Sequence, residues 1–371
     1  MQLVSTTRDS LLKPLQFVSG IVERRHTLPI LANLLMRKNN ESISFISTDI
    51  DIQITTITDF GVGDDDFSTT VGARKLLDIL RAMPEGPISL TMKENRMVVQ
   101  SGKSRFSLQT LAASEFPIML ENNQNVRSFE ISQKEFKQLI SQVHFAMAQQ
   151  DIRYYLNGML MVLDDNKLIA VATDGHRLAY GQIILEKPPV GETNKIEVIV
   201  PRKTILECQH LLDDVDAPLK VSISPTQIKF EFNTIELLSK LVEGKFPDYQ
   251  RVIPKGHKNS FIVPREIFQS ALQRAAILTT DKFKGIRCSL KDNLLVIQST
   301  NAEQEEAQEE IETAYEGDHL DIGFNVTYLL DVLSNVKNES IQINLGDSNS
   351  SALITIPDNE NFKYVVMPMR I

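Results

Sequence analysis

Residues 173–177, Thr-Asp-Gly-His-Arg, are the part of the chain that most resembles a catalytic cluster. An aspartate can orient a histidine for proton transfer, and a neighbouring arginine can hold an anion. Asp174 and His176 would then serve a hydrolase. However, Asp-Gly between two strand-like runs is also a strong signal for a β-hairpin turn. From the residues alone we favour a binding surface here over a purely structural turn, and a structural turn over catalysis.

The other residue types that commonly carry out chemistry are few and widely spaced. The two cysteines, Cys208 and Cys288, are too few for a disulfide framework or a cysteine-based zinc site. The six histidines show no metal-ligand spacing, and the sequence has no Walker loop, dinucleotide-binding glycine pattern or nucleophile elbow. We therefore expect no catalytic residue, no metal and no cofactor.

Amphipathic segments recur along the chain. Apolar residues at helical spacing predict one family of helices, in the N-terminal region and at 132–147 and 264–278. In these helices Leu12, Phe136 and Phe268 occupy matching places, 124 and 132 residues apart. Ser132 and Glu135 form a capping box at the start of the second. Repetition on this scale predicts that the chain is built from three similar units.

A second family of helices supports the same repeat. Helices are predicted at 71–83, 200–212 and 324–336, and Leu76–Leu80 matches Leu329–Leu333 almost letter for letter. Strand-like alternation fills the segments between the helices. We predict an α+β protein of three repeated domains, each with two helices packed on an antiparallel sheet. The domains are placed at 1–126, 127–254 and 255–371.

The charge of the chain is unevenly distributed. The chain has 371 residues and a net charge of −9, with a hydrophobic fraction typical of a folded protein. Residues 301–318 carry eight acidic residues and no Lys or Arg, whereas cations recur on the predicted helices or their flanks. This pattern suggests one shared surface that attracts phosphates without reading bases. With no signal peptide and no membrane-spanning run, we expect a soluble, cytoplasmic protein.

Several motifs resemble one known family over the full length of the chain. They are Arg25–Leu31 (RHTLPIL), QDIRYYLNGML at 150–160, ATDGHRLA at 172–179, KFPDYQRVIP at 245–254, GFNVTYLLDVL at 323–333 and the terminal YVVMPMRI. In order and spacing they are similar to the bacterial DNA polymerase III beta subunits, the sliding clamps.

The resemblance implies the clamp fold and a head-to-tail homodimer. Six similar domains would close a ring around double-stranded DNA, with helices lining the hole and sheet outside. The ring would tether the polymerase for processive synthesis and have no catalytic site of its own. The implied partners are the clamp loader complex and, through short linear peptides, replicative and translesion polymerases, mismatch-repair proteins and ligase. No membrane partner is expected.

The resemblance also assigns residues to three sites. DNA-facing positions would be Arg25, Arg74, Gln150, Arg153, Tyr154, Tyr155, Arg202 and Lys203. The peptide pocket would comprise Leu156, Thr173, Gly175, His176, Arg177, Leu178, Pro247, Arg251, Val252, Tyr328, Ser351, Val365, Val366, Met367, Pro368, Met369, Arg370 and Ile371. The dimer seam would pair Phe106 and Leu108 with Ile277 and Leu278. His26 and Gln250 depart from the family pattern beside two of these sites.

Two other functions stay open on the sequence. A repeat scaffold that binds only proteins would share the threefold pattern but would not be retained on circular DNA. A hydrolase that uses Asp174 and His176 would lose turnover when His176 is replaced. The missing nucleophile and metal constellation argues against the hydrolase.

Overall fold

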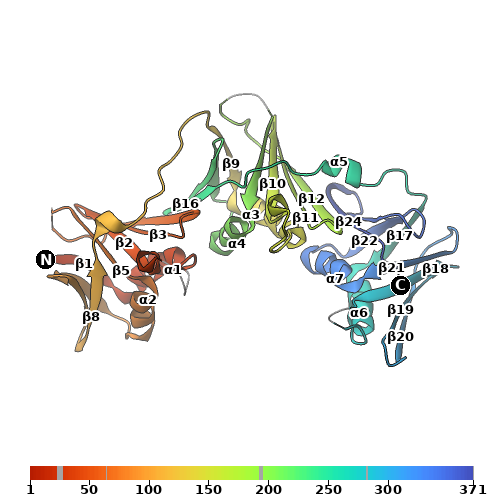
Figure 1. Cartoon of the computed structure of the whole chain (residues 1–371), viewed down its shortest axis with the longest axis horizontal. Coiled ribbons are helices and arrows are strands. Elements are labelled where there is room, and N and C mark those ends of the chain that lie inside the picture. The colour runs from red at the N-terminus through yellow and green to blue at the C-terminus, as the bar shows by residue number, and fades with distance from the viewer. Residues whose placement is uncertain (23–27, 64, 192–194, 281–282, 371) are drawn as a thin grey trace. The chain divides into compact units, whose positions relative to one another are not determined.

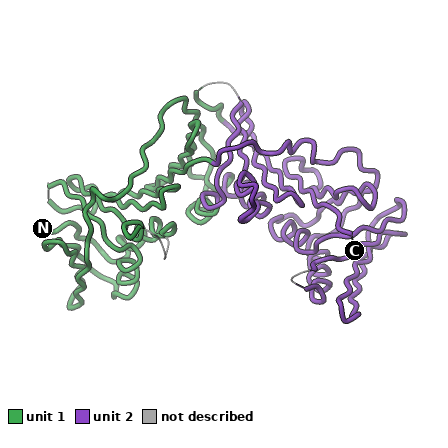
Figure 2. Tube along the Cα trace, in the orientation of Figure 1, with its two compact units in different colours: residues 1–135, 187–193, 206–241 green, residues 136–186, 194–205, 242–371 purple. Residues whose placement is uncertain are grey.

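The computed structural model describes residues 1–22, 28–63, 65–191, 195–280 and 283–370. The chain forms two compact units, which Figure 2 shows in different colours. Unit 1 contains residues 1–135, 187–193 and 206–241, and unit 2 contains residues 136–186, 194–205 and 242–371. Among the described residues, no helix is long and apolar enough to span a membrane.

One order of elements occurs three times along the chain (Figure 1). Each repeat has one strand, a helix, four strands, a second helix and three strands. The first repeat contains β1 (Gln2–Thr7), α1 (Arg8–Ser19), β2 (Asn33–Asn39), β3 (Ser42–Thr48), β4 (Ile52–Thr58), β5 (Phe67–Gly72), α2 (Ala73–Ala82), β6 (Pro87–Lys93), β7 (Arg96–Ser101) and β8 (Ser104–Leu111).

The second and third repeats have the same sequence of elements. The second contains β9 (Arg127–Ser132), α3 (Gln133–Ser141), β10 (Gly158–Asp164), β11 (Lys167–Thr173), β12 (Arg177–Ile184), β13 (Ile196–Pro201), α4 (Arg202–Leu211), β14 (Pro218–Ile223), β15 (Gln227–Phe232) and β16 (Ile235–Lys240). A short helix, α5 (Tyr249–Val252), follows it. The third contains β17 (Asn259–Pro264), α6 (Arg265–Ala276), β18 (Gly285–Lys291), β19 (Leu294–Thr300), β20 (Glu306–Glu312), β21 (Leu320–Asn325), α7 (Val326–Asn335), β22 (Ser340–Leu345), β23 (Ala352–Ile356) and β24 (Asn359–Val366).

The first helix of each repeat buries the same position. Leu11, Phe136 and Phe268 are each the fourth residue of their helix, and all three side chains are buried. Burying one such side chain contributes roughly 1.5–3 kcal/mol to stability. The sequence alignment through Leu12 was wrong by one residue, because Leu12 is only half-buried. Two neighbouring leucines fit the apolar pattern equally well.

The predicted helix over 132–147 is shorter than expected. Its capping box is present, since the Glu135 N–H donates to Ser132 Oγ at 3.1 Å. However, α3 ends at Ser141 and a separate 3-10 turn follows at His144–Ala146. The His144 ring nitrogen Nδ1 lies 3.2 Å from the Ile140 carbonyl and 3.0 Å from that of Ser141. The imidazole therefore satisfies carbonyls that a longer helix would have bonded to its own backbone.

Strand pairing links consecutive repeats within each unit. Every pair between the named strands is antiparallel, and the third strand after the first helix pairs with the last strand of the next repeat. Thus β4 pairs with β16 in unit 1. In unit 2, β12 pairs with β24 (Figure 1). The strand orders are β1-β6-β7-β8-β5-β2-β3-β4-β16-β15-β14-β9 in unit 1, and β13-β10-β11-β12-β24-β23-β22-β17 and β20-β19-β18-β21 in unit 2.

The hairpin expected at Asp-Gly is present and belongs to the repeat. The Thr173 hydroxyl donates to the Arg177 carbonyl at 2.6 Å and accepts from the Gly175 N–H. In the first repeat, the Thr48 hydroxyl donates to the Ile52 carbonyl at 2.8 Å in the same way. Residues 173–175 therefore form a turn that the fold uses elsewhere.

Candidate binding surfaces

An apolar cluster in unit 2 brings together predicted pocket residues that are distant in sequence. Leu156, Leu178 and Val365 are 1%, 3% and 1% exposed and belong to one buried cluster. Leu178 and Val365 are cross-strand partners on β12 and β24. The loop before α5 adds Phe246 and the helix adds Tyr249 to the same cluster. These residues can form the floor of a hydrophobic pocket.

The predicted pocket residues around this floor are more exposed. Val252 and Met367 are 46% and 45% exposed, and exposed Arg251 forms an ion pair of 2.9 Å with Asp248. Gly175, His176, Pro247 and Arg370 are exposed, and Tyr328, Ser351, Pro368 and Met369 are half-buried. Val366 and Thr173 are buried. Ile371 lies outside the described residues.

Two backbone hydrogen bonds hold the C-terminal segment in place. The Met367 N–H donates to the His176 carbonyl at 2.9 Å, and the Met369 N–H donates to the Gly323 carbonyl at 2.8 Å. Pro368, which has no N–H, lies between these two donors. The segment after β24 therefore lies against the turn before β12 and against β21.

Arg177 is the most highly connected of the predicted pocket residues. Its guanidinium donates to Asp174 Oδ2 at 3.0 Å, to the Phe145 carbonyl at 2.8 Å and to Asp331. The same group lies 4.6 Å from the ring centroid of Tyr328. The sequence did not assign Asp331 or Phe145 to the pocket. The match between Leu76–Leu80 and Leu329–Leu333 drew attention to the segment around Asp331 but not to its contact.

A polar cavity of about 460 Å³ collects residues from two of the predicted sites. Gln150, Arg153 and Arg202, predicted to face DNA, line it together with His176 and Tyr328, predicted to bind peptide. Arg153 is paired with a carboxylate there, since its Nη2 lies 2.9 Å from Asp151 Oδ2. Hydrogen bonds from Arg153 lower the pKa of Asp151 to about 2. The aspartate is therefore ionised at neutral pH, and it holds the arginine side chain in place.

The remaining DNA-facing candidates of the second repeat are Tyr154, Tyr155 and Lys203. Tyr154 is 56% exposed, and its ring centroid is 5.9 Å from that of Tyr155. Lys203 is the second residue of α4 and is half-buried. The Arg202 N–H donates to the Asn157 carbonyl at 3.0 Å, which joins the start of α4 to the loop before β10.

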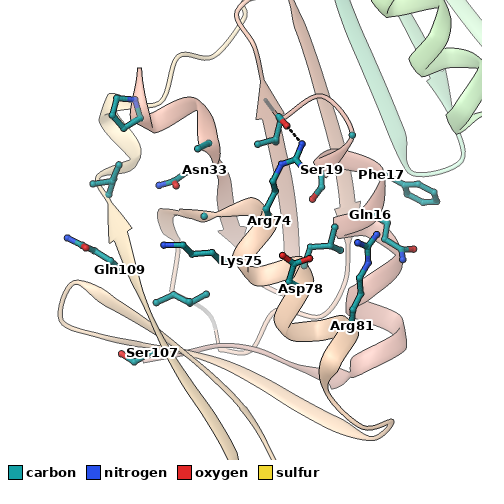
Figure 3. Close-up of a pocket in the computed structure, with 18 of the residues that line it drawn as sticks. Gln16, Phe17, Ser19, Asn33, Arg74, Lys75, Asp78, Arg81, Ser107 and Gln109 are labelled. Atoms are coloured by element: carbon teal, nitrogen blue, oxygen red, sulfur yellow. Dashed lines mark hydrogen bonds between the residues drawn. The ribbon is translucent and has the colours of Figure 1, made fainter. Parts of the chain in front are cut away.

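A broad groove of about 1490 Å³ lies in unit 1 and is lined mostly by the first repeat, with His210 of α4 added from the second (Figure 3). Side chains of α1, α2 and β8 line it. Arg74, Lys75 and Arg81 of α2 make its wall cationic, and Leu108 of β8 adds an apolar side chain. The Arg74 guanidinium donates to the Val22 carbonyl at 2.7 Å (Figure 3). Arg25, another DNA-facing candidate, lies outside the described residues.

The four predicted seam residues belong to the first and the third repeats. Phe106 is 40% exposed on β8, and Ile277 is 76% exposed as the C-cap of α6. Leu108 and Leu278 are half-buried. In the described structure, β8 pairs fully with β7 but meets β5 only at Thr110 and Leu111, and β20 pairs only with β19. Both strands therefore have unused hydrogen-bonding edges.

The structure gives little support to chemistry at residues 173–177. The Asp174 carboxylate accepts from the backbone N–H groups of His176 and Arg177 and from the Arg177 side chain. The carboxylate therefore bonds to groups of the turn and not to the imidazole ring. Among the described residues, no three His, Cys, Asp or Glu side chains are grouped to hold a metal. Burial raises the pKa of both thiols, that of Cys288 to about 12.

Three family models match consecutive parts of the chain. The N-terminal domain of the DNA polymerase III beta subunit matches residues 1–120, its central domain residues 130–248 and its C-terminal domain residues 250–370. Together they cover almost the whole chain, in order.

The chain belongs to the DNA polymerase III beta subunit family.

Full-length relatives and a solved structure agree with this assignment. The beta sliding clamps of Pseudomonas aeruginosa and Escherichia coli K12 are each 43% identical to this chain, covering 98% of both chains in each case. A crystal structure of the Pseudomonas aeruginosa sliding clamp bound to griselimycin is 42% identical, with a TM-score of 0.95 over 100% of both chains. This member of the beta subunit family is thus a sliding clamp, a polymerase processivity factor rather than an enzyme.

Proposed function

We propose that two copies of this chain close head to tail into a six-domain ring that encircles duplex DNA and tethers the polymerase. The observation that carries this proposal is the pair of unused strand edges at the two ends of the repeat series, on β8 and β20. Unpaired edges are normally covered, because exposed N–H and C=O groups invite pairing with another chain.

The internal pairing rule identifies the partner of each edge. Within the chain, β4 pairs with β16 and β12 with β24, which are the third strand after the first helix of one repeat and the last strand of the next. Applied once more, the rule pairs β20 with the β8 strand of a second copy. A second β20–β8 pair then closes the two-chain ring.

The same comparison of repeats predicts the register of the seam. In unit 2, Leu178 of β12 lies opposite Val365 of β24. At the equivalent positions of the proposed seam, Glu306 of β20 would lie opposite Ser107 of β8. Phe106 then lies opposite the small side chain of Ala307. The charges are complementary, since β20 carries four glutamates and the β8 hairpin carries Lys103 and Arg105. Opposite charges on facing strands favour this pairing over other registers.

We infer that DNA contacts a cationic inner surface without base readout. The proposed DNA-facing residues are Arg25, Arg74, Gln150, Arg153, Tyr154, Tyr155, Arg202 and Lys203. The resemblance to sliding clamps supports this set, and so do the exposed arginines on α2 and in the loop before β10. Because phosphate contacts carry affinity but no sequence information, a ring held by them can slide.

We infer that short partner peptides bind over the apolar cluster of unit 2, between α5, the β12 turn and the C-terminal segment. Its buried aliphatic floor and half-exposed rim support this assignment. We further propose that the partners are the clamp loader complex, replicative and translesion polymerases, mismatch-repair proteins and ligase, all in the cytoplasm. Domain boundaries after residues 126 and 254 are supported by β9 and β17, which begin at Arg127 and Asn259.

Sizing the native chain tests the proposal. We expect a stable dimer at micromolar concentration in sedimentation velocity, because each seam buries an apolar patch and pairs two strand edges. A stable monomer at that concentration would contradict the ring.

A further inference from the structure

We propose that Asp331 is a positioning residue for the peptide pocket, which it shapes by holding the Arg177 guanidinium against the ring of Tyr328. The inference rests on the proposed peptide pocket of unit 2. Asp331 lies outside the predicted pocket residues and acts through its ion pair with Arg177.

The first step is that each of the three nitrogens of the Arg177 guanidinium already donates to a partner within the protein. Its side chain is 11% exposed, and its three groups of N–H donors go to Asp174, Asp331 and the Phe145 carbonyl. A guanidinium offers five N–H donors in a fixed planar fork, so these contacts determine the plane of the group. Arg177 therefore supports the pocket wall rather than binding a peptide charge directly.

The second step is that the fixed guanidinium holds an aromatic wall. Arg177 lies 4.6 Å from the Tyr328 ring centroid, within the range of a cation–π contact. The Tyr328 ring stacks in turn on His176, with centroids 6.5 Å apart and planes 17° from parallel. The carbonyl of His176 accepts the Met367 N–H of the C-terminal segment. Asp331 thus holds Arg177 in place, Arg177 holds the Tyr328 ring, and that ring stacks on His176.

The third step concerns which carboxylate matters. Asp174 is in the turn that precedes Arg177 and also caps backbone N–H groups, so its loss would change the turn itself. Asp331 is on α7 of the third repeat, and its side chain is 37% exposed. Replacing it removes the ion pair between Arg177 and α7 and leaves the contact between Arg177 and the Tyr328 ring as the remaining link among the described residues. The backbone of the pocket would remain in place.

The experiment compares Asp331→Asn with the native dimer, using a short labelled peptide that contains adjacent Leu and Phe residues. Fluorescence anisotropy should show about tenfold weaker binding, because a charged hydrogen bond is lost beside the pocket wall. Asp331→Glu should recover most of the affinity. Asp214→Asn, on an exposed loop of unit 1, is the matched control and should bind as the native chain does.

Two further readouts separate positioning from a general structural role. In an Arg177→Ala background, Asp331→Asn should cause no additional loss of affinity, because the two residues act as one unit. The fluorine NMR signal of 3-fluorotyrosine at position 328 should shift in Asp331→Asn without peptide. Native-like binding by Asp331→Asn, or an equal loss in the Arg177→Ala background, would overturn the inference.

The fluorine signal also distinguishes this inference from the proposed function. A native chain that fails to bind any such peptide refutes the proposed pocket. The Tyr328 signal reports on the ring whether or not peptide binds. A signal that stays unchanged when Asp331 is replaced shows that Asp331 does not position the ring.

Discussion

Replacing Ile277 and Leu278 together with alanine is expected to convert the dimer into monomers. Ile277 is 76% exposed in the single chain although it ends an amphipathic helix, so the seam is the place where it would be buried. Truncating a buried Leu or Ile to Ala costs roughly 2–5 kcal/mol. Even partial burial of both side chains raises the dimer dissociation constant more than about a hundredfold.

Sedimentation velocity across a dilution series measures this change. Ile262→Ala is the matched control, because Ile262 is 52% exposed on β17 and lies outside the predicted seam. The control should remain a dimer wherever the native chain does. An unchanged dissociation constant for the double variant would show that the seam lies elsewhere.

Deletion of residues 367–371 is expected to abolish peptide binding and leave the dimer intact. In the proposed pocket this segment supplies Met367 and Met369 to the rim, and its N–H groups bond to the His176 and Gly323 carbonyls. Losing these side chains and both anchoring bonds should weaken binding at least about a hundredfold. The deletion begins after Val366, because Val366 is buried and pairs with Arg177 and Ala352.

Peptide anisotropy and sedimentation velocity on the same sample check the deletion. Leu120→Ala is the control for removing an exposed apolar side chain outside the proposed pocket, since Leu120 is 82% exposed in unit 1. It should bind peptide normally. Native affinity after the deletion would remove the C-terminal segment from the pocket.

The repeat could be predicted from the sequence because it rests on local patterns. The spacing of apolar residues on the helices and their alternation on the strands recur in every repeat. The order of elements and the second helices, α2, α4 and α7, could therefore be predicted from these patterns. The position of Leu11 did not follow, because Leu11 and Leu12 are equally apolar. The end of α3 at Ser141 depends on the contact of the His144 ring with the last carbonyls of the helix. The spacing of apolar residues does not predict that contact.

Residues could be assigned to the proposed sites only through family resemblance, and their contacts could not be predicted. Leu156, Leu178 and Val365 have no shared pattern in the sequence, yet they pack in one cluster. Asp331 was missed because its contact with Arg177 joins residues 154 positions apart. A charge pair between separate elements leaves no periodic signal, so only the folded backbone brings the two groups together.

Retention on circular DNA tests the closed ring most directly. Labelled protein is loaded by a clamp loader onto nicked circular duplex DNA, and the fraction that remains bound is measured at high salt by gel filtration. We predict that the protein stays on the circle and is lost once a restriction enzyme opens it, because topology rather than contact energy holds a ring in place. Equal loss from circular and linear DNA would contradict the encircling ring.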